Sequence, residues 1–126
     1  MAIYGIGVDI IEIDRIKETI ERWQRRFIKR IFTPGEINYC TERSDPFRCF
    51  AVRFAAKEAV FKALGTGWSG ELSWQDVEIL NTRSGKPWVK LRNRADQLMN
   101  LHSLSRVSLS LSHSRDYAVA MAVIEN

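Results

Sequence analysis

Three charged side chains, Lys57, Glu58 and Lys62, lie among core-type residues in the segment that begins at Arg53. Residues 53–67, RFAAKEAVFKALGTG, contain phenylalanines, a valine, a leucine and several alanines, a pattern typical of a buried helix. On a helix, Glu58 and Lys62 are four residues apart and share a face, while Arg53 and Lys57 form a second pair on a neighbouring stripe. Such pairs also occur on ordinary exposed helices, so mild helix stabilisation is the alternative to a chemical role.

A further charged residue, Asp9, ends an apolar, glycine-containing stretch near the N-terminus. In proteins Mg²⁺ takes one or two carboxylates and leaves its other positions to water and substrate phosphates. Asp9 and Glu58 therefore predict a magnesium site. Lys62, one turn after Glu58, can stabilise a phosphate or protonate a leaving oxygen. The alternative for Asp9 is a cap on the following helix.

Other polar segments carry weaker signals. The loop at residues 65–67 follows a helix, so it cannot hold phosphate at a helix N-terminus, although its glycines let a ligand approach the backbone. Gly65 also suits the C-terminal end of the helix. His113 is a candidate phosphate contact, because no nucleophile motif supports a catalytic triad. Lys86, in a Gly-Lys-Pro turn, is within reach of an anionic ligand if one binds beside that turn.

Composition indicates one globular domain over residues 1–126. The chain has 19 Lys and Arg against 15 Asp and Glu, and the net charge of +4 favours acidic partners. The N-terminus lacks the basic start of a signal peptide, and no apolar run reaches the roughly 20 residues that span a bilayer. We therefore expect a soluble, cytoplasmic protein in which Cys40 and Cys49 are reduced thiols, with a single disulfide between them as the alternative.

Hydrophobic periodicity predicts the element order strand, helices, hairpin, helix, hairpin. The predicted strands cover residues 2–11, 72–80, 87–91, 107–112 and 117–124, and the predicted helices cover 13–31, 47–64 and 94–102, with a short helix that starts at Thr33 and ends within 40–43. Trp23 is expected on the core face of the first helix, and Gly5 and Gly7 indicate close approach of another backbone or a ligand. The order indicates an α+β fold in one layered domain.

Four motifs together resemble the holo-acyl-carrier-protein synthases, the small 4′-phosphopantetheinyl transferases of bacterial lipid synthesis. They are GIGVDIIEIDRI near the start, RFAAKEAVFKALGTG in the middle, the GKP turn, and SLSLSHSRDYAVA near the end. The motifs follow the order of the family and cover nearly the full chain. The resemblance implies one α+β domain of the phosphopantetheinyl transferase type, with long helices packed on a mostly antiparallel sheet.

The resemblance also implies a reaction. The 4′-phosphopantetheine group of coenzyme A moves to a serine of apo-acyl carrier protein in fatty acid biosynthesis, and adenosine 3′,5′-bisphosphate leaves. Asp9 and Glu58 are implied to bind Mg²⁺ together with the pyrophosphate, and Lys62 to contact the phosphates. The metal ion and the pyrophosphate are therefore the expected partners of the three charges Lys57, Glu58 and Lys62. The base that takes the serine proton stays open between Glu58 and a water activated by the metal.

The same resemblance assigns two binding regions and an assembly. The implied coenzyme A contacts are Arg53, Lys62, Gly65, Thr66, Lys86, Pro87, Ser112 and His113. Arg15, Arg22 and Arg26 resemble the basic helix that receives the acidic carrier protein, and a solvated face is the alternative for each of them. The family is typically a homotrimer with sites shared between subunits.

Two other functions fit part of the sequence. A small RNA-binding module would explain the basic helix, but it leaves Asp9 and Glu58 unexplained and lacks an RNP-type aromatic motif. A non-catalytic domain that docks acidic proteins through the first helix is the second alternative. The transferase interpretation explains more of the residues, so we expect neither nucleic acid nor membrane among the partners.

Overall fold

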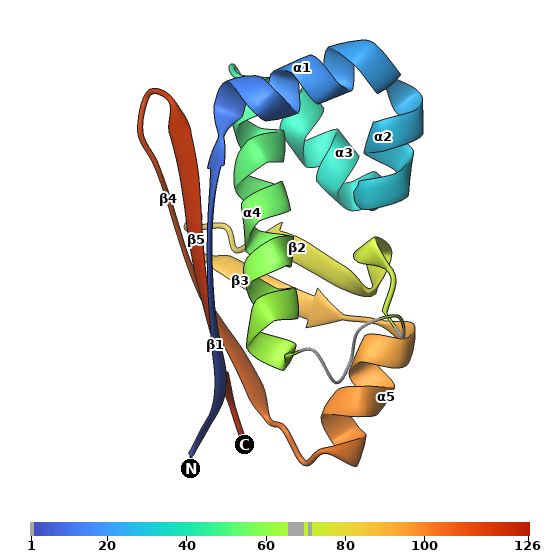
Figure 1. Cartoon of the computed structure of the whole chain (residues 1–126), viewed down its shortest axis with the longest axis vertical. Helices are drawn as coiled ribbons and strands as arrows, with labels where there is room; N and C mark the ends of the chain where they lie inside the picture. The colour runs from blue at the N-terminus through green and yellow to red at the C-terminus, as the bar shows by residue number, and fades with distance from the viewer. Residues whose placement is uncertain (1, 66–69, 71) are drawn as a thin grey trace.

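The computed structural model describes residues 2–65, 70 and 72–126, in which two antiparallel sheets pack on different faces of one long helix, α4 (Figure 1). The elements are β1 (Ile3–Glu12), α1 (Ile13–Trp23), α2 (Arg25–Ile31), α3 (Pro34–Thr41), α4 (Pro46–Leu64), the 3₁₀ helix η2 (Trp74–Asp76), β2 (Val77–Asn81), β3 (Pro87–Leu91), α5 (Asn93–Leu101), β4 (Arg106–His113) and β5 (Tyr117–Glu125). The α+β class and the order of elements confirm the prediction. In the described ranges, none of these helices has the length and apolarity needed to cross a bilayer.

The larger sheet has the strand order β1-β5-β4, with β5 at its centre as its apolar sequence predicts. Every second residue of β5 is small or apolar and buried against α4, from Ala118 to Ile124. The intervening positions point to the opposite face, where Val8 on β1 lies in register with Met121 on β5. No described element covers that opposite face (Figure 1).

Glycines bring β1 into direct contact with the backbone of α4. A Cβ atom added at Gly7 would overlap the carbonyl oxygen of Ala59, and one added at Gly5 would overlap that of Ala63. Glycine at both positions therefore allows an approach that no side chain permits. The prediction that these glycines mark another backbone is confirmed.

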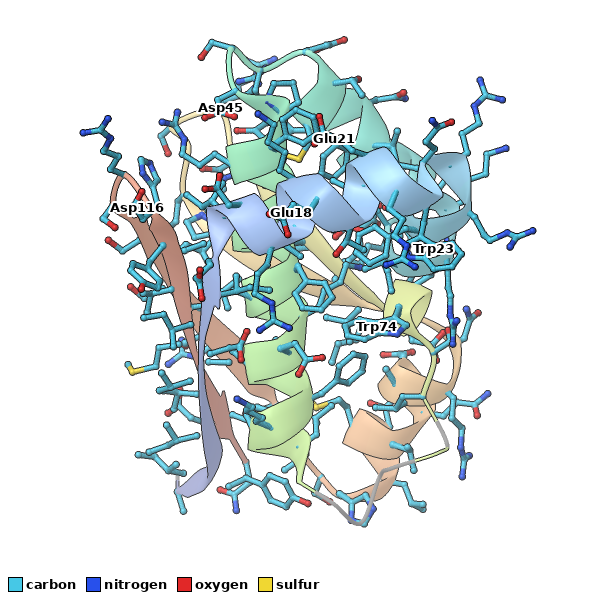
Figure 2. All side chains as sticks on the ribbon, turned by 45° about the horizontal axis from the view of Figure 1, so that its top comes forward. Glu18, Glu21, Trp23, Asp45, Trp74 and Asp116 are labelled. Carbon is cyan, nitrogen blue, oxygen red and sulfur yellow. A yellow bond between two sulfur atoms is a disulfide. The ribbon has the colours of Figure 1, made fainter. Side chains whose placement is uncertain are left out.

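The helix predicted over 13–31 is two helices, so the prediction of one helix is wrong. The chain turns at Gln24, whose φ of 50° is outside the helical range, and α1 ends there. Trp23, expected in the core, is 47% exposed beside the turn (Figure 2). The apolar spacing continues across the turn because α1 and α2 bury their apolar faces in the same cluster, so periodicity alone does not reveal the break.

The strand predicted over 72–80 begins only at Val77. A capping box between Ser73 and Asp76 stabilises the start of η2. The residues before Val77 therefore do not belong to the sheet. Trp74, predicted as a strand residue, instead packs its ring against Phe54 and Phe61, with centroids 5.2 and 5.3 Å apart. The Ser-x-x-Asp spacing is the signal that sequence reasoning overlooked.

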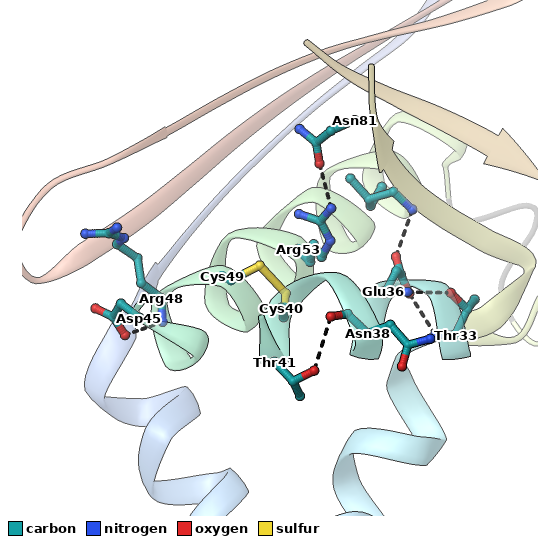
Figure 3. The surroundings of a disulfide bond; sticks show 11 residues. Thr33, Glu36, Asn38, Cys40, Thr41, Asp45, Arg48, Cys49, Arg53 and Asn81 are labelled. Carbon is teal, nitrogen blue, oxygen red and sulfur yellow. Dashed lines mark hydrogen bonds between the residues drawn. A yellow bond between two sulfur atoms is a disulfide. The ribbon is translucent and has the colours of Figure 1, made fainter. Parts of the chain in front are cut away.

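Cys40 and Cys49 form a disulfide, so the prediction of two reduced thiols is wrong (Figure 3). Cys40 is near the end of α3 and Cys49 is in the first turns of α4, and their Cα atoms are 5.4 Å apart. The tight turn between the helices brings the two side chains together. The prediction of reduced thiols was based on the cellular compartment and took no account of this distance.

Candidate active site

The predicted magnesium ligands come together between β1 and α4. Asp9 lies on the covered face of the sheet, opposite Ala120 of β5, and therefore points toward α4. Asp9 and Glu58 line one pocket of about 360 Å³, together with Arg15. The alternative role of Asp9 as a helix cap is wrong, because β1 continues past it and the N-cap of α1 is Glu12.

Lys62 already contacts one member of this pair, Asp9. Its Nζ atom donates to Oδ1 of Asp9 at 3.0 Å and to the carbonyl oxygen of Val8 at 3.1 Å. The Lys62 side chain is half exposed, whereas that of Asp9 is 15% exposed, so the ammonium closes the solvent side of the carboxylate. Glu58 and Lys62 thus share one face of α4, as their spacing predicts.

The environment of Glu58 opposes its ionisation. Partial burial raises the pKa of Glu58, the nearby carboxylate of Asp9 raises it further, and Lys62 only partly offsets both effects. Two carboxylates held in one pocket at this electrostatic cost are stabilised when a cation binds between them.

The donor set fits Mg²⁺ better than a transition metal. In the described part of the chain, no cluster of three or more His, Cys, Asp and Glu side chains could enclose a metal ion. A structural zinc site needs such a cluster, whereas Mg²⁺ needs only one or two carboxylates and completes its shell with water and phosphate. Asp9, which already accepts from an ammonium group, and Glu58 supply those two carboxylates.

A second pocket, of about 470 Å³, contains three residues that the resemblance implies for coenzyme A: Arg53, Pro87 and His113. Arg43 and Arg48 also line it, and sequence reasoning missed both. They come from the α3–α4 turn and the first turn of α4, and only the tertiary fold brings them beside Arg53.

The remaining residues implied for coenzyme A are less closely grouped. Lys86 and Ser112 are exposed and do not line the second pocket, although Gly85 of the same turn does. Gly65 ends α4 with a φ of 91°, as its predicted role at the helix end requires. Thr66 lies outside the described residues.

Arg53 is a buried cation at the wall of the second pocket. Its guanidinium donates to Oδ1 of Asn81 at 2.6 Å and lies 4.2 Å from the ring centroid of Tyr39 (Figure 3). Among the described residues its Nε atom has no hydrogen-bond partner, and burial lowers the pKa of the group. The guanidinium of Arg43 lies 4.3 Å from the centroid of the same ring. A wall that concentrates positive charge in this way suits a phosphate group.

The two pockets open on different parts of the molecule. Among the described residues, none lines both of them. Arg53 and Glu58 are five residues apart on α4, which places their side chains about 140° apart around the helix. The carboxylate pair and the arginine pocket therefore do not form one continuous cavity within a single chain.

Lys57 does not belong to the site. We expected a metal ion and a pyrophosphate to balance all three charges of the central helix, and for Lys57 this is wrong. The side chain is wholly buried, and its Nζ atom lies 2.8 Å from Oε1 of Glu36 on α3. Lys57 lies on the same face of α4 as Arg53, which is a different face from that of Glu58. Its partner Glu36 is 21 residues earlier in the chain, so the spacing of residues within the helix does not reveal the pair.

The three arginines of the basic surface lie on α1 and α2 and are exposed. Arg15 lines the carboxylate pocket, and Arg26 lines a neighbouring groove together with Trp23. The Arg22 guanidinium lies 5.2 Å from the ring centroid of Trp23. Trp23, which sequence reasoning assigned to the core, thus belongs to an exposed surface that combines positive charge with an aromatic ring.

Comparisons with known proteins show similarity over nearly the full chain. A family model described as the 4′-phosphopantetheinyl transferase superfamily matches residues 5–122. The chain is 52% identical over 120 residues to the holo-[acyl-carrier-protein] synthase of Chloroherpeton thalassium, covering 95% of this chain and 96% of that protein.

Solved structures are also similar. The holo-[acyl-carrier-protein] synthase of Neisseria meningitidis matches with a TM-score of 0.92 and 37% identity, covering 99% of this chain and 100% of that one. The synthase of Helicobacter pylori, solved in complex with coenzyme A, matches with a TM-score of 0.84 and 32% identity over 95% of this chain and 99% of that one.

Proposed function

The chain belongs to the 4′-phosphopantetheinyl transferase superfamily, and we propose from this premise that it transfers 4′-phosphopantetheine from coenzyme A to a serine of an apo-acyl carrier protein. Adenosine 3′,5′-bisphosphate is the second product, and fatty acid biosynthesis in the cytoplasm is the setting. The observation that carries the proposal is the cluster of Asp9, Glu58 and Lys62 between β1 and α4. The relatives named as synthases, and the one solved with coenzyme A, support the same reaction.

In this proposal Asp9 and Glu58 hold Mg²⁺, which neutralises the charge of the pyrophosphate when bound. Phosphoryl transfer depends more on positioning and charge neutralisation than on covalent help from the protein. Lys62 leaves Asp9 for the phosphate oxygens, or gives its proton to the leaving oxygen. The base that takes the serine proton is Glu58 or a water that the metal would activate.

The arginine pocket is proposed to hold the adenosine phosphates. Arg53, with an unpaired Nε, and the nearby Arg43 and Arg48 supply donors for phosphate oxygens. His113 adds a further polar contact, and Pro87 supplies an apolar wall beside the nucleotide. The synthase solved with coenzyme A supports a nucleotide site in this fold.

We also propose that the active form is a homotrimer with shared sites. The uncovered face of the larger sheet carries Ile6, Val8, Ile10 and Met121, which are 57%, 51%, 61% and 43% exposed. A contiguous apolar face of this kind is typical of a protein–protein interface. A second copy on this face would also supply the arginine pocket that one chain holds apart from its carboxylates.

The carrier is proposed to dock on α1 and α2. Its acidic surface would meet Arg15, Arg22 and Arg26, and Trp23 would contact an apolar side chain at the centre of the interface. Because Arg15 lines the carboxylate pocket, a carrier bound here brings its serine toward Asp9 and Glu58.

The test is intact-protein mass spectrometry of an apo-acyl carrier protein incubated with this protein and coenzyme A. We expect the carrier to gain one phosphopantetheine group with Mg²⁺ present and none with EDTA. Carrier binding without a mass gain would contradict the transferase and indicate an interaction domain. Binding of RNA with a steep salt dependence and no carrier modification would indicate the RNA-binding alternative.

A further inference from the structure

We propose that the buried ion pair between Lys57 and Glu36 is a positioning device that sets the rotation of α4 and thereby holds Glu58 opposite Asp9. The proposal rests on the proposed function, because it assigns Glu58 a role in metal binding and transfer. Lys57 and Glu58 are neighbours in sequence, but their side chains leave α4 about 100° apart. Lys57 thus fixes the helix from the side away from the site.

The hydrogen bonds of Lys57 tie α4 to the smaller sheet. Its Nζ atom donates to Oε1 of Glu36 at 2.8 Å, to the carbonyl oxygen of Trp74 at 3.1 Å and to that of Val77 at 2.5 Å. An ammonium group has three donors, and all three are used. Trp74 and Val77 are in η2 and at the start of β2, so this contact fixes α4 against both.

Glu36 extends the anchor to α3. Its Oε1 atom accepts from the backbone N–H of Thr33 at 2.8 Å, closing the capping box of that helix (Figure 3). Its Oε2 atom accepts from the backbone N–H of Ile79 on β2 at 2.8 Å. One carboxylate therefore joins α3, α4 and β2, and both of its oxygen atoms accept from buried donors.

Stability alone does not account for this pair. Buried ion pairs can often be replaced by apolar residues without loss of stability, because removing two charges from water is costly. Burial lowers the pKa of Lys57, with Glu36 opposing the shift, which is consistent with that cost. An apolar contact would permit the helix to rotate, whereas three directed hydrogen bonds do not.

Small rotations of α4 matter for the carboxylate pair. A side-chain tip lies about 6 Å from a helix axis, so a rotation of roughly 10° moves it by about 1 Å. A displacement of that size in a reacting site can lower a rate on the order of 100-fold. Meanwhile β1 is held in the larger sheet by its pairing with β5, so Asp9 does not follow a rotation of α4.

The test removes both charges together, because Lys57→Met alone would leave Glu36 buried without a partner. Two double variants are made: Glu36→Gln with Lys57→Met, and Glu36→Gln with Lys57→Gln. The single variant Glu36→Gln keeps the bonds of Lys57 to the two carbonyl oxygens. Thermal unfolding, carrier modification kinetics with coenzyme A, and Mn²⁺ binding measured by electron paramagnetic resonance are recorded for each variant.

We expect both double variants to fold and to keep the KM for coenzyme A, while kcat falls at least about tenfold. Mn²⁺ affinity should fall with kcat, because the two carboxylates lose their alignment. The single variant Glu36→Gln should lose stability but keep kcat within about threefold of wild type. This split between stability and kcat is the signature of positioning.

A matched control removes the neighbouring ion pair of Arg92 and Glu78, in which Nε of Arg92 lies 3.0 Å from Oε1 of Glu78 and neither residue is on α4. Glu78→Gln with Arg92→Met should lower stability and leave Mn²⁺ affinity unchanged. Double variants of Lys57 and Glu36 that fold with wild-type kcat and Mn²⁺ affinity would overturn the positioning role, as would loss of folding in both. An inactive wild-type protein would contradict the proposed function, yet the Mn²⁺ measurements would still decide the positioning proposal.

Discussion

The surroundings of Glu58 make its ionised form unfavourable for the stability of the fold. Its folded-state pKa is raised, mainly by burial and then by Asp9, so the folded protein binds a proton at Glu58 more tightly than the unfolded chain does. The stability linked to this proton is present below the unfolded pKa of about 4.3 and is lost as the pH rises through the folded pKa. At neutral pH, in the absence of metal, ionised Glu58 therefore destabilises the fold.

Glu58→Gln should accordingly separate activity from stability. We expect turnover to fall on the order of 100-fold or more, because one of the two proposed carboxylate ligands is lost. In EDTA at pH 7 the variant should unfold at a higher temperature than wild type, and the difference should disappear as the pH falls to about 4. Differential scanning calorimetry across this range measures it. Near-normal activity would contradict the metal role, and a lower unfolding temperature at pH 7 would contradict the pKa direction.

Lys62 pairs with Asp9 in this conformation, so it would compete with the proposed metal ion for that carboxylate. Lys62→Gln should therefore raise Mn²⁺ affinity in the absence of coenzyme A by up to about fivefold, because half-exposed ion pairs contribute about 0.2–1 kcal/mol. The same variant should lower kcat, since the phosphates lose a cation. Isothermal titration calorimetry gives the affinity.

Arg15→Gln is the matched control for Lys62, because Arg15 lines the same pocket and the pair formed by Asp9 is with Lys62. It removes one positive charge without freeing the carboxylate, so its effect on Mn²⁺ affinity should be smaller. Equal effects of the two variants would assign the change to general electrostatics.

Residue types and local spacing predict part of the site. Asp9, Glu58 and Lys62 were predicted because a carboxylate on an apolar strand and a charged pair on a core helix are costly to bury unless they bind an ion. Arg43 and Arg48 were missed because they form a positively charged pocket only together with Arg53, and the three residues meet only after α3 and α4 fold together. The family resemblance supplied Pro87 and His113, which local chemistry leaves ambiguous.

At the scale of elements, the contact between β1 and α4 depends on the absence of side chains. Gly7→Ala would drive a methyl group into the carbonyl oxygen of Ala59, so the strand and the helix must separate. We expect a loss of at least about 1–3 kcal/mol of stability, measured by urea unfolding, and weaker Mn²⁺ binding. Gly85→Ala is the control, because its φ of 91° strains an added methyl while nothing lies within 4 Å of it. Unchanged metal binding in Gly7→Ala would contradict a role of this contact in setting the site.

Elements whose stop signals are local were predicted well, and elements whose ends depend on tertiary contacts were not. The Thr33 capping box and the Gly65 helix end are visible in the sequence, and both are present. The turn at Gln24 was missed because no glycine or proline marks it. The disulfide was also missed, because it depends on how closely α3 and α4 meet.

At the scale of the whole molecule, the proposed shared site makes a prediction about mixed assemblies. Glu58→Gln removes the function of the carboxylate pair, and Arg53→Ala removes that of the arginine pocket, so each variant alone should be nearly inactive. After subunit exchange, a mixture should recover activity, because some sites would combine an intact pair from one subunit with an intact pocket from another. A mixture as inactive as its components would contradict shared sites.

The assembly itself is tested on the uncovered face of the larger sheet. Val8→Asp places a charge at its centre, opposite Met121 in the register of β1 and β5. Light scattering should show a trimer for wild type and a monomer for this variant, which should also lose activity. A wild-type monomer with full activity would contradict the trimer.

The glycine and alanine seam between β1, α4 and β5 has a consequence for motion. Backbones that touch directly leave no space for local opening, so the amide hydrogens of this layer that are hydrogen-bonded within the sheet or the helix should exchange with solvent only when the whole protein unfolds. Asp9 and Glu58 are attached to this slowest-exchanging layer. The two carboxylates should therefore keep their spacing through the native-state fluctuations that open surface segments, and deuterium uptake followed peptide by peptide would show β1 and α4 among the last regions to exchange.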